Sequence, residues 1–205
     1  MKIILASQSP RRREILKRIG VNFEVMPSQK EEVVTSTIPY EVVKELSSQK
    51  ADDIKNKYFE INNKSLEDVI IIGADTIVSF EDKILGKPKD KKDAYSMLKL
   101  ISGNVHQVYT GVSVIYIKAN EELDMAKEIS FYEETNVYVK ALTDKDILEY
   151  IETGEPMDKA GSYAIQGIFG KYIDKYQGDY DNVVGLPANR LVKELKENFD
   201  VEIWV

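Results

Sequence analysis

The chain has 205 residues, of which 43% are hydrophobic and 31% are charged, an ordinary composition for a globular protein. Its formal net charge of −7 disfavours stable binding to nucleic acid or to a membrane surface, since both are anionic. The sequence contains no cysteine, which excludes disulfides, thiol nucleophiles and cysteine metal sites. With neither a signal-peptide pattern nor an apolar run of about 18–20 residues, we expect a cytoplasmic protein.

Apolar runs and helical patterns alternate through the first hundred residues, and longer strands follow. The order predicts the α/β class with a mixed β-sheet, in one domain spanning residues 1–205. The predicted strands cover residues 3–6, 23–26, 69–78, 105–117, 129–139 and 201–205. The predicted helices cover residues 10–19, 39–57 and 91–101, begin again at 143–146, and end with 187–198.

The stretch from residue 154 to 187 has no clear periodicity and contains six glycines. Glycine at this density gives the backbone unusual freedom. The pattern fits either a mobile substrate loop or a succession of tight turns.

Three consecutive arginines, Arg11, Arg12 and Arg13, fall in the first turn of a predicted helix with Ser9 as N-cap and Pro10 as first residue. A cation at this positive end of the helix dipole costs roughly 0.3–1 kcal/mol. The cost disappears if an anion binds there, because backbone N–H groups and guanidinium groups can share one phosphate. The alternative is a solvated basic face with pairs of the Arg11–Glu14 kind. The pattern favours the phosphate site.

Asp75 interrupts a predicted strand that otherwise looks buried on both faces. An unpaired buried carboxylate is costly, so Asp75 needs a cation, a metal ion or several N–H donors. It is either a structural residue at a strand end or a general base or metal ligand. In the second case Gly73, two residues earlier, would let a ligand approach closely.

Two lysines are candidate partners of an anion. Lys50 projects from the apolar stripe of its predicted helix, so it either extends to solvent or points into an interior cleft. Lys87 lies in a turn stiffened by Pro88 just after the Asp75 strand, which brings it toward Asp75. An ordinary solvated lysine is the alternative for both.

Adjacent Glu31 and Glu32 follow the second strand and could offer a carboxylate to a divalent ion, or could be surface residues. His106, the single histidine, lies in a strand pattern that favours a packing role over a catalytic one. No Ser/His/Asp relay, HExxH motif or GxxxxGK[ST] loop can be assembled, which disfavours a Walker-type NTPase.

With these residues in view, the chain resembles the Maf-like nucleoside triphosphate pyrophosphatases, over essentially its whole length. The resemblance is carried by short motifs in the same order and at the same spacing. They are Ala6–Arg12, Glu31–Glu32, Lys50–Ala51, Gly73–Thr76, Leu85–Pro88, Ser102–Gly103, Thr110–Val112, Asp158–Gly167 and Val184–Pro187.

The resemblance implies an elongated mixed β-sheet with flanking helices and two lobes around a cleft, related to the inosine triphosphate pyrophosphatases. It implies hydrolysis of a nucleoside triphosphate to the monophosphate and pyrophosphate with Mg²⁺ or Mn²⁺, and a possible homodimer. Arg12, Thr76 and Gln166 match positions that separate a dTTP/UTP subgroup from a 7-methyl-GTP subgroup, and point to the pyrimidine group. Matching positions imply roles for the rest: Asp75 as proton acceptor, Ser7, Arg11, Arg12, Lys50 and Lys87 on phosphates, and Glu32 with Asp75 at the metal.

The first hypothesis is therefore an enzyme that hydrolyses dTTP and UTP, or modified pyrimidine nucleotides, in a house-cleaning role. The second is a regulator of cell division that binds nucleotides without hydrolysis, and a 7-methyl-GTP-type pyrophosphatase is a further alternative. Asp75 favours the enzyme, because a carboxylate that faces a triphosphate would repel it in a protein that only binds.

Overall fold

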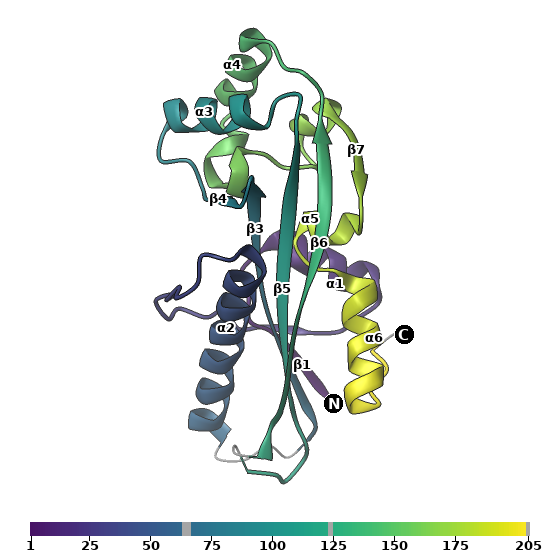
Figure 1. Ribbon diagram of the computed structural model, residues 1–205. Helices are drawn as coiled ribbons and strands as arrows, with labels where there is room; N and C mark the ends of the chain where they lie inside the picture. Colours follow the sequence, from purple (N-terminus) through teal and green to yellow (C-terminus); the bar gives the residue numbers. More distant parts are fainter. Residues whose placement is uncertain (63–66, 123–124, 204–205) are drawn as a thin grey trace.

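One seven-stranded sheet runs through the computed structural model, which describes residues 1–62, 67–122 and 125–203 (Figure 1). The strand order is β2-β1-β3-β5-β6-β7, with β4 paired to β3. Strand β1 is parallel to both of its neighbours, and every other pair is antiparallel. The strands are β1 (Lys2–Leu5), β2 (Glu24–Val25), β3 (Val69–Phe80), β4 (Lys83–Leu85), β5 (Val105–Ile117), β6 (Lys127–Val139) and β7 (Ile173–Gln177).

Helices cover both faces of the sheet and one end of it (Figure 1). The α-helices are α1 (Pro10–Arg18), α2 (Pro39–Asn62), α3 (Lys91–Ile101), α4 (Asp144–Glu152), α5 (Tyr180–Val184) and α6 (Ala188–Phe199). Short 3₁₀ helices are η2 (Glu155–Asp158), η3 (Ala160–Ser162) and η4 (Ile168–Tyr172). None of the helices in the described ranges is long and apolar enough to cross a membrane.

Strand β3 is three times as long as β1, and the difference leaves part of one β3 edge open. β1 pairs with β3 only as far as Ile72, and β4 resumes the pairing at Val78. The other edge of β3 pairs with β5 from Val69 to Ser79. Among the strands that the structure describes, residues 73–77 therefore have a neighbour on the β5 side alone.

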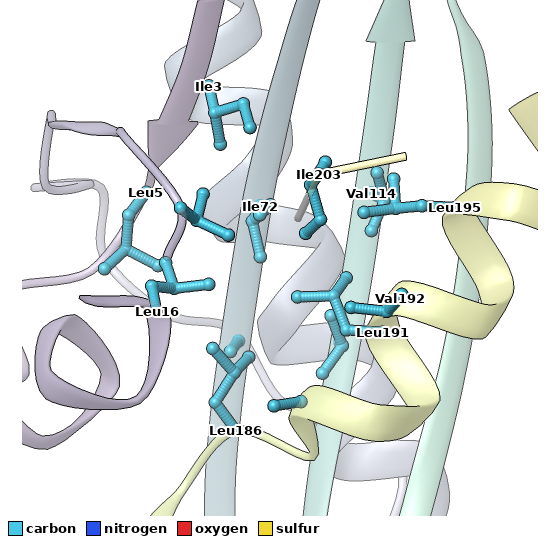
Figure 2. Close-up of a cluster of buried hydrophobic side chains, with 14 of the residues drawn as sticks. Ile3, Leu5, Leu16, Ile72, Val114, Leu186, Leu191, Val192, Leu195 and Ile203 are labelled. Atoms are coloured by element: carbon cyan, nitrogen blue, oxygen red, sulfur yellow. The ribbon is translucent and has the colours of Figure 1, made fainter. Parts of the chain in front are cut away.

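Two apolar cores lie on opposite faces of the part of the sheet that is drawn in the lower half of Figure 1. On one face, side chains of β1, β3 and β5 pack against α1 and α6, as the sticks in Figure 2 show. On the other face, Ala51, Ile54 and Tyr58 of α2 pack on Ile71 and Ile115. A third core forms the upper lobe, where the far ends of β3, β5 and β6 pack against α3 and α4. This arrangement confirms the predicted elongated mixed sheet with two lobes (Figure 1).

Two glycines allow α2 to lie unusually close to the sheet. A Cβ added to Gly73 would overlap the carbonyl oxygen of Ser47, and one added to Gly111 would overlap that of Val43. The expectation that Gly73 leaves room for a ligand is therefore wrong, because the backbone of α2 already occupies that space. The close packing matters for the site, since Lys50 lies on α2 between Ser47 and Ala51, the two residues that approach Gly73.

Most predicted strands and helices agree with the structure, but β4 (Lys83–Leu85) was not predicted and the C-terminus differs. Residues 201–203 form no strand; Val201 and Ile203 instead pack in the core beside α6, and residues 204 and 205 lie outside the described part. The glycine-rich stretch 154–187 is a succession of turns and 3₁₀ helices, as one of the two alternatives predicted. It also contains β7 and α5, which periodicity did not indicate.

His106 is fully buried in the upper lobe and bonds through Nε2 to the Tyr163 hydroxyl at 2.7 Å. Their rings meet edge to face at 5.2 Å. Burial lowers the pKa of His106 from its ordinary 6.5 to about 4. The predicted packing role of His106 is thus confirmed.

We expect Gly111→Ala to lower the free energy of unfolding by about 1–3 kcal/mol, because the added methyl group collides with the backbone of α2. Gly86→Ala is the matched control, since a Cβ at Gly86 meets nothing within 4 Å. Urea unfolding of both variants checks this. Equal stability of the two variants would contradict the close packing of α2.

We expect His106 to make the protein less stable as the pH falls from about 6.5 to about 4. In this window His106 binds a proton in the unfolded chain but not in the folded protein, so the free energy of unfolding increases with pH. Between pH 7.5 and pH 5 the contribution is about 2 kcal/mol. The decrease measured by urea unfolding should be smaller by that amount in His106→Gln, and an identical decrease would contradict it.

Candidate active site

The loop after β1 leads directly into the N-terminus of α1. Ser9 is the N-cap, its Oγ accepts from the backbone N–H of Arg12 at 3.5 Å, and Pro10 is the first helical residue, as predicted. The loop begins where β1 ends beside Ile72, so it lies next to the open edge of β3. The three arginines are therefore placed at that edge.

Arg12 turns inward, is only 9% exposed, and uses its guanidinium to join three segments of the chain. Its Nε donates to the carbonyl oxygen of Gly185 at 2.8 Å, and the terminal nitrogens donate to Ser7 Oγ at 2.9 Å and Thr76 Oγ1 at 3.0 Å. Burial lowers the pKa of Arg12, while the charge of Asp75 opposes this shift. Arg12 therefore fixes the shape of the site in addition to supplying charge.

The other arginines of the segment divide between cleft and surface. Arg11 lines the cleft described below, and Arg13 donates to the carbonyl oxygen of Gln8 at 3.0 Å. Arg18, the last residue of α1, pairs with Asp181 of α5. The solvated basic face thus accounts for only part of the cluster.

The cation that pairs with the Asp75 carboxylate is the ammonium group of Lys50. Strand alternation directs Asp75 toward α2, and the close approach of that helix brings the Lys50 ammonium onto Asp75 Oδ1. The same ammonium contacts Glu32 Oε1 at 3.0 Å. The side chains of Lys50 and Asp75 are 15% and 16% exposed, so the pair is shielded from bulk water while still reaching the cleft.

Glu32 and Asp75 are the two carboxylates of the site that could hold a metal ion. Both contact one ammonium group, so two carboxylates converge on a single cationic position. The described residues contain no cluster of three or more His, Cys, Asp or Glu side chains suited to a metal. Two carboxylates fit Mg²⁺ or Mn²⁺ held jointly with substrate phosphates and water, because Mg²⁺ commonly binds in that way.

A cleft of about 880 Å³ opens over this group of side chains. It brings together eight of the nine candidate residues: Ser7, Arg11, Arg12, Glu32, Lys50, Asp75, Thr76 and Lys87. The upper lobe contributes Asp158 and Lys159, which pair with each other, and α5 contributes Val183 and Val184. The bond from Lys159, with help from the charge of Arg11, lowers the pKa of Asp158.

The ninth candidate, Gln166, lines a smaller and more apolar pocket of about 40 Å³. This pocket adjoins the cleft, since Arg11, Thr76, Val183 and Val184 line both. The rest of its wall is mostly apolar and comes from Val78, Val108, Tyr163, Ala164 and Ile165.

Hydrogen bonds already occupy the Thr76 hydroxyl. It accepts from Arg12 and lies 2.9 Å from Thr110 Oγ1, which in turn donates to the carbonyl oxygen of Asn182 at 2.9 Å. The Asn182 amide donates to Val108 O at 3.0 Å and Thr135 Oγ1 at 2.8 Å. This buried network fastens α5, and with it the wall shared by the two pockets, to β3, β5 and β6.

Sequence reasoning gave no role to Asp158, Lys159 or the carbonyl group of Gly185. The motifs that contain them were among the landmarks of the resemblance, which was the available signal. Because these residues lie far from Asp75 in the sequence, their spacing did not predict that the upper lobe lines the cleft.

Solved structures with a similar arrangement include the Ham1 protein of Staphylococcus aureus, with a TM-score of 0.39 and 12% identity over 68% of this chain and 72% of that one. A HAM1 protein from Coxiella burnetii gives a TM-score of 0.42 and 10% identity over 68% and 73%. Similarity at this level carries no functional argument.

Curated relatives are much closer. A dTTP/UTP pyrophosphatase of Agathobacter rectalis is 48% identical over 201 residues, 96% of this chain and 97% of that protein. One of Thermoanaerobacter sp. is 48% identical over 203 residues, 99% and 100%, and one of Bacillus anthracis is 47% identical over 202 residues, 98% and 97%. The family model described as Maf-like protein matches residues 2–198. The chain belongs to the Maf-like protein family.

Proposed function

We propose that this protein hydrolyses the nucleoside triphosphates dTTP and UTP to the nucleoside monophosphate and pyrophosphate. The observation that carries the proposal is the convergence of cations from both lobes in one cleft that also contains the carboxylate of Asp75, beside a small apolar pocket. Relatives that are 47–48% identical over nearly their whole length bear the name dTTP/UTP pyrophosphatase.

The cleft has the charge that a triphosphate needs. Arg11, Lys50, Lys87 and Lys159 line it together with the buried Arg12, in a protein whose net charge is −7. Charge-assisted hydrogen bonds contribute roughly 1.5–3 kcal/mol each, so a few of them hold a tail of about four negative charges. This local positive charge supports an anionic substrate and explains arginines at the N-terminus of α1.

In this proposal Asp75 acts as the general base. It orients a water molecule and accepts its proton while the water oxygen attacks the α-phosphorus in line with the leaving group. The bond from the α-phosphorus to the bridging oxygen breaks, and pyrophosphate leaves with the electron pair. Lys87 and Lys159 stabilise the charge that develops on it, and Lys50 is released from Asp75 to bind phosphate oxygens.

Glu32 and Asp75 would hold the divalent cation. When bound, Mg²⁺ or Mn²⁺ neutralises phosphate charge and lowers the pKa of a coordinated water. Lys50 occupies the position between the two carboxylates in this structure, so the same residue balances their charge before substrate and metal enter.

The base would lie where the small pocket meets the cleft. The apolar wall of the pocket suits one face of a pyrimidine ring, and Gln166 offers both a donor and an acceptor to the imide edge of thymine or uracil. Because the Thr76 hydroxyl is bonded to Arg12 and Thr110, we propose that Thr76 shapes this pocket through Arg12.

Purified protein incubated with UTP, dTTP, CTP, GTP and 7-methyl-GTP tests the proposal. We expect monophosphate and pyrophosphate from UTP and dTTP, and in H₂¹⁸O the label in UMP, because water attacks the α-phosphorus. Label in pyrophosphate would contradict the mechanism. Absence of pyrophosphate with every nucleotide would favour a regulator that only binds.

We expect Asp75→Asn to reduce kcat by at least about 100-fold, since it removes the proton acceptor. Binding of UMP, measured by calorimetry, should be kept, because the cations around the cleft remain. Asp52→Asn on α2 is the control, as Asp52 pairs with Lys55 outside the cleft. Near-normal turnover by Asp75→Asn would overturn the role of Asp75.

We expect chelation by EDTA to abolish hydrolysis and added Mg²⁺ or Mn²⁺ to restore it. Glu32→Gln should raise the Mg²⁺ concentration for half-maximal rate about tenfold or more, because a charged ligand is lost. Glu31→Gln is the neighbouring control, since Glu31 does not line the cleft. The same Mg²⁺ dependence in both variants would remove Glu32 from the metal site.

A further inference from the structure

The carboxylate of Glu155 holds the turn that carries Gln166. Glu155 is the first residue of η2. Its Oε2 accepts a hydrogen bond from the backbone N–H of Ile168 at 3.0 Å, and its Oε1 accepts one from the Tyr150 hydroxyl at 2.8 Å. Both oxygens of a partly buried carboxylate are thus used in fixing one backbone position.

Gly167 lets this carboxylate lie directly against the turn. A Cβ added to Gly167 would overlap both oxygens of Glu155. The φ angle of Gly167 is −96°, which any residue can adopt, so glycine is needed here for the close approach and not for its conformation. The N–H of Gly167 also bonds to the carbonyl oxygen of Ala164 at 3.1 Å, which closes the turn around Gln166.

Tyr150 anchors Glu155 to the interior of the upper lobe. Its side chain is 2% exposed on α4, and its ring lies 5.0 Å from that of the fully buried Phe169. Phe169 follows Ile168 in the chain, so the turn is held on two sides by the same packed core. The turn of Gln166 is therefore held by the bond from Ile168 to Glu155 and by this core, while Tyr150 supports the carboxylate.

Glu155 lines neither the cleft nor the small pocket. Asp158 and Lys159, three and four residues later, line the phosphate end, and Gln166 lines the base end. Glu155 thus joins the two parts of the upper lobe that contact the ends of a nucleotide, without touching it.

We infer that Glu155 is a positioning residue for nucleobase discrimination: it fixes the turn that presents the Gln166 amide to the base pocket. The inference rests on the proposed function. Asp75 and the cations of the cleft are untouched by Glu155, so its loss affects the KM for a matching base and the selectivity among bases, and leaves kcat nearly unchanged.

Steady-state kinetics with UTP and CTP tests the inference, because the two bases differ in the donor and acceptor at the edge that an amide reads. Glu155→Ala should raise the KM for UTP about tenfold and reduce the UTP-to-CTP ratio of kcat/KM by a similar factor, as expected for loss of a hydrogen bond to a charged group. Gly167→Ala should have the same effect, because its methyl group displaces the carboxylate.

Two further variants separate positioning from general destabilisation. Glu155→Gln keeps a carbonyl oxygen for the Ile168 N–H, so it should restore most of the selectivity. Tyr150→Phe loses one bond to Glu155 but leaves the Ile168 bond, so the UTP-to-CTP ratio should stay within about twofold of that of the unaltered protein. Gly167→Ala keeps the inference testable if Glu155→Ala does not fold, with these two variants as its controls.

An unchanged ratio in folded Glu155→Ala and Gly167→Ala would overturn the inference. So would an equal loss of kcat with both nucleotides, which would indicate a structural role only, or a Glu155→Gln variant no better than Glu155→Ala. If the unaltered protein hydrolyses neither UTP nor any other nucleotide, the proposed function itself is wrong and the inference falls with it. The two failures are thus distinguishable.

Discussion

The interrupted edge of β3 is the constraint on which the rest of the site depends. β1 stops pairing at Ile72 and β4 begins at Val78, so five residues of a long central strand have no strand partner on this edge within the part of the chain that the structure describes. A sheet edge leaves side chains and backbone accessible from the side while the strand itself stays rigid through its other partner. Here that partner is β5, which pairs along the whole segment.

Because side chains alternate along a strand, neighbouring residues of β3 point to opposite faces of the sheet. Asp75 points to the α2 face, where Lys50 meets it, and Thr76 points to the α1 face, where Arg12 meets it. One strand therefore holds the proposed general base and a residue that shapes the site at adjacent positions. The glycines at 73 and 111 make the first contact possible, because they let α2 come close enough for Lys50 to reach.

Each buried charge in the site has oppositely charged or polar groups in direct contact with it. The Lys50 ammonium lies between Glu32 and Asp75, and the Arg12 guanidinium has polar partners from three segments. Such partners are required, since an unpaired charge in a partly buried position is costly. An incoming triphosphate can exchange these contacts for its own, so the energy of binding is set by the difference between the two sets of contacts.

The sequence by itself determined the strands with strong periodicity, the cap at Ser9 and the anomalies at Arg11–Arg13, Asp75 and Lys50. Each is a local signal, because hydrophobic spacing and misplaced charge can be recognised within a few residues. Tertiary structure alone decided that Gly73 faces a helix and not a ligand, that Asp158 and Lys159 close over the cleft, and that Glu155 holds the turn of Gln166. The C-terminal residues 201–203 pack as an irregular segment despite their apolar pattern. These outcomes depend on contacts between segments far apart in the chain, and no local pattern of residue types encodes which partner a side chain meets.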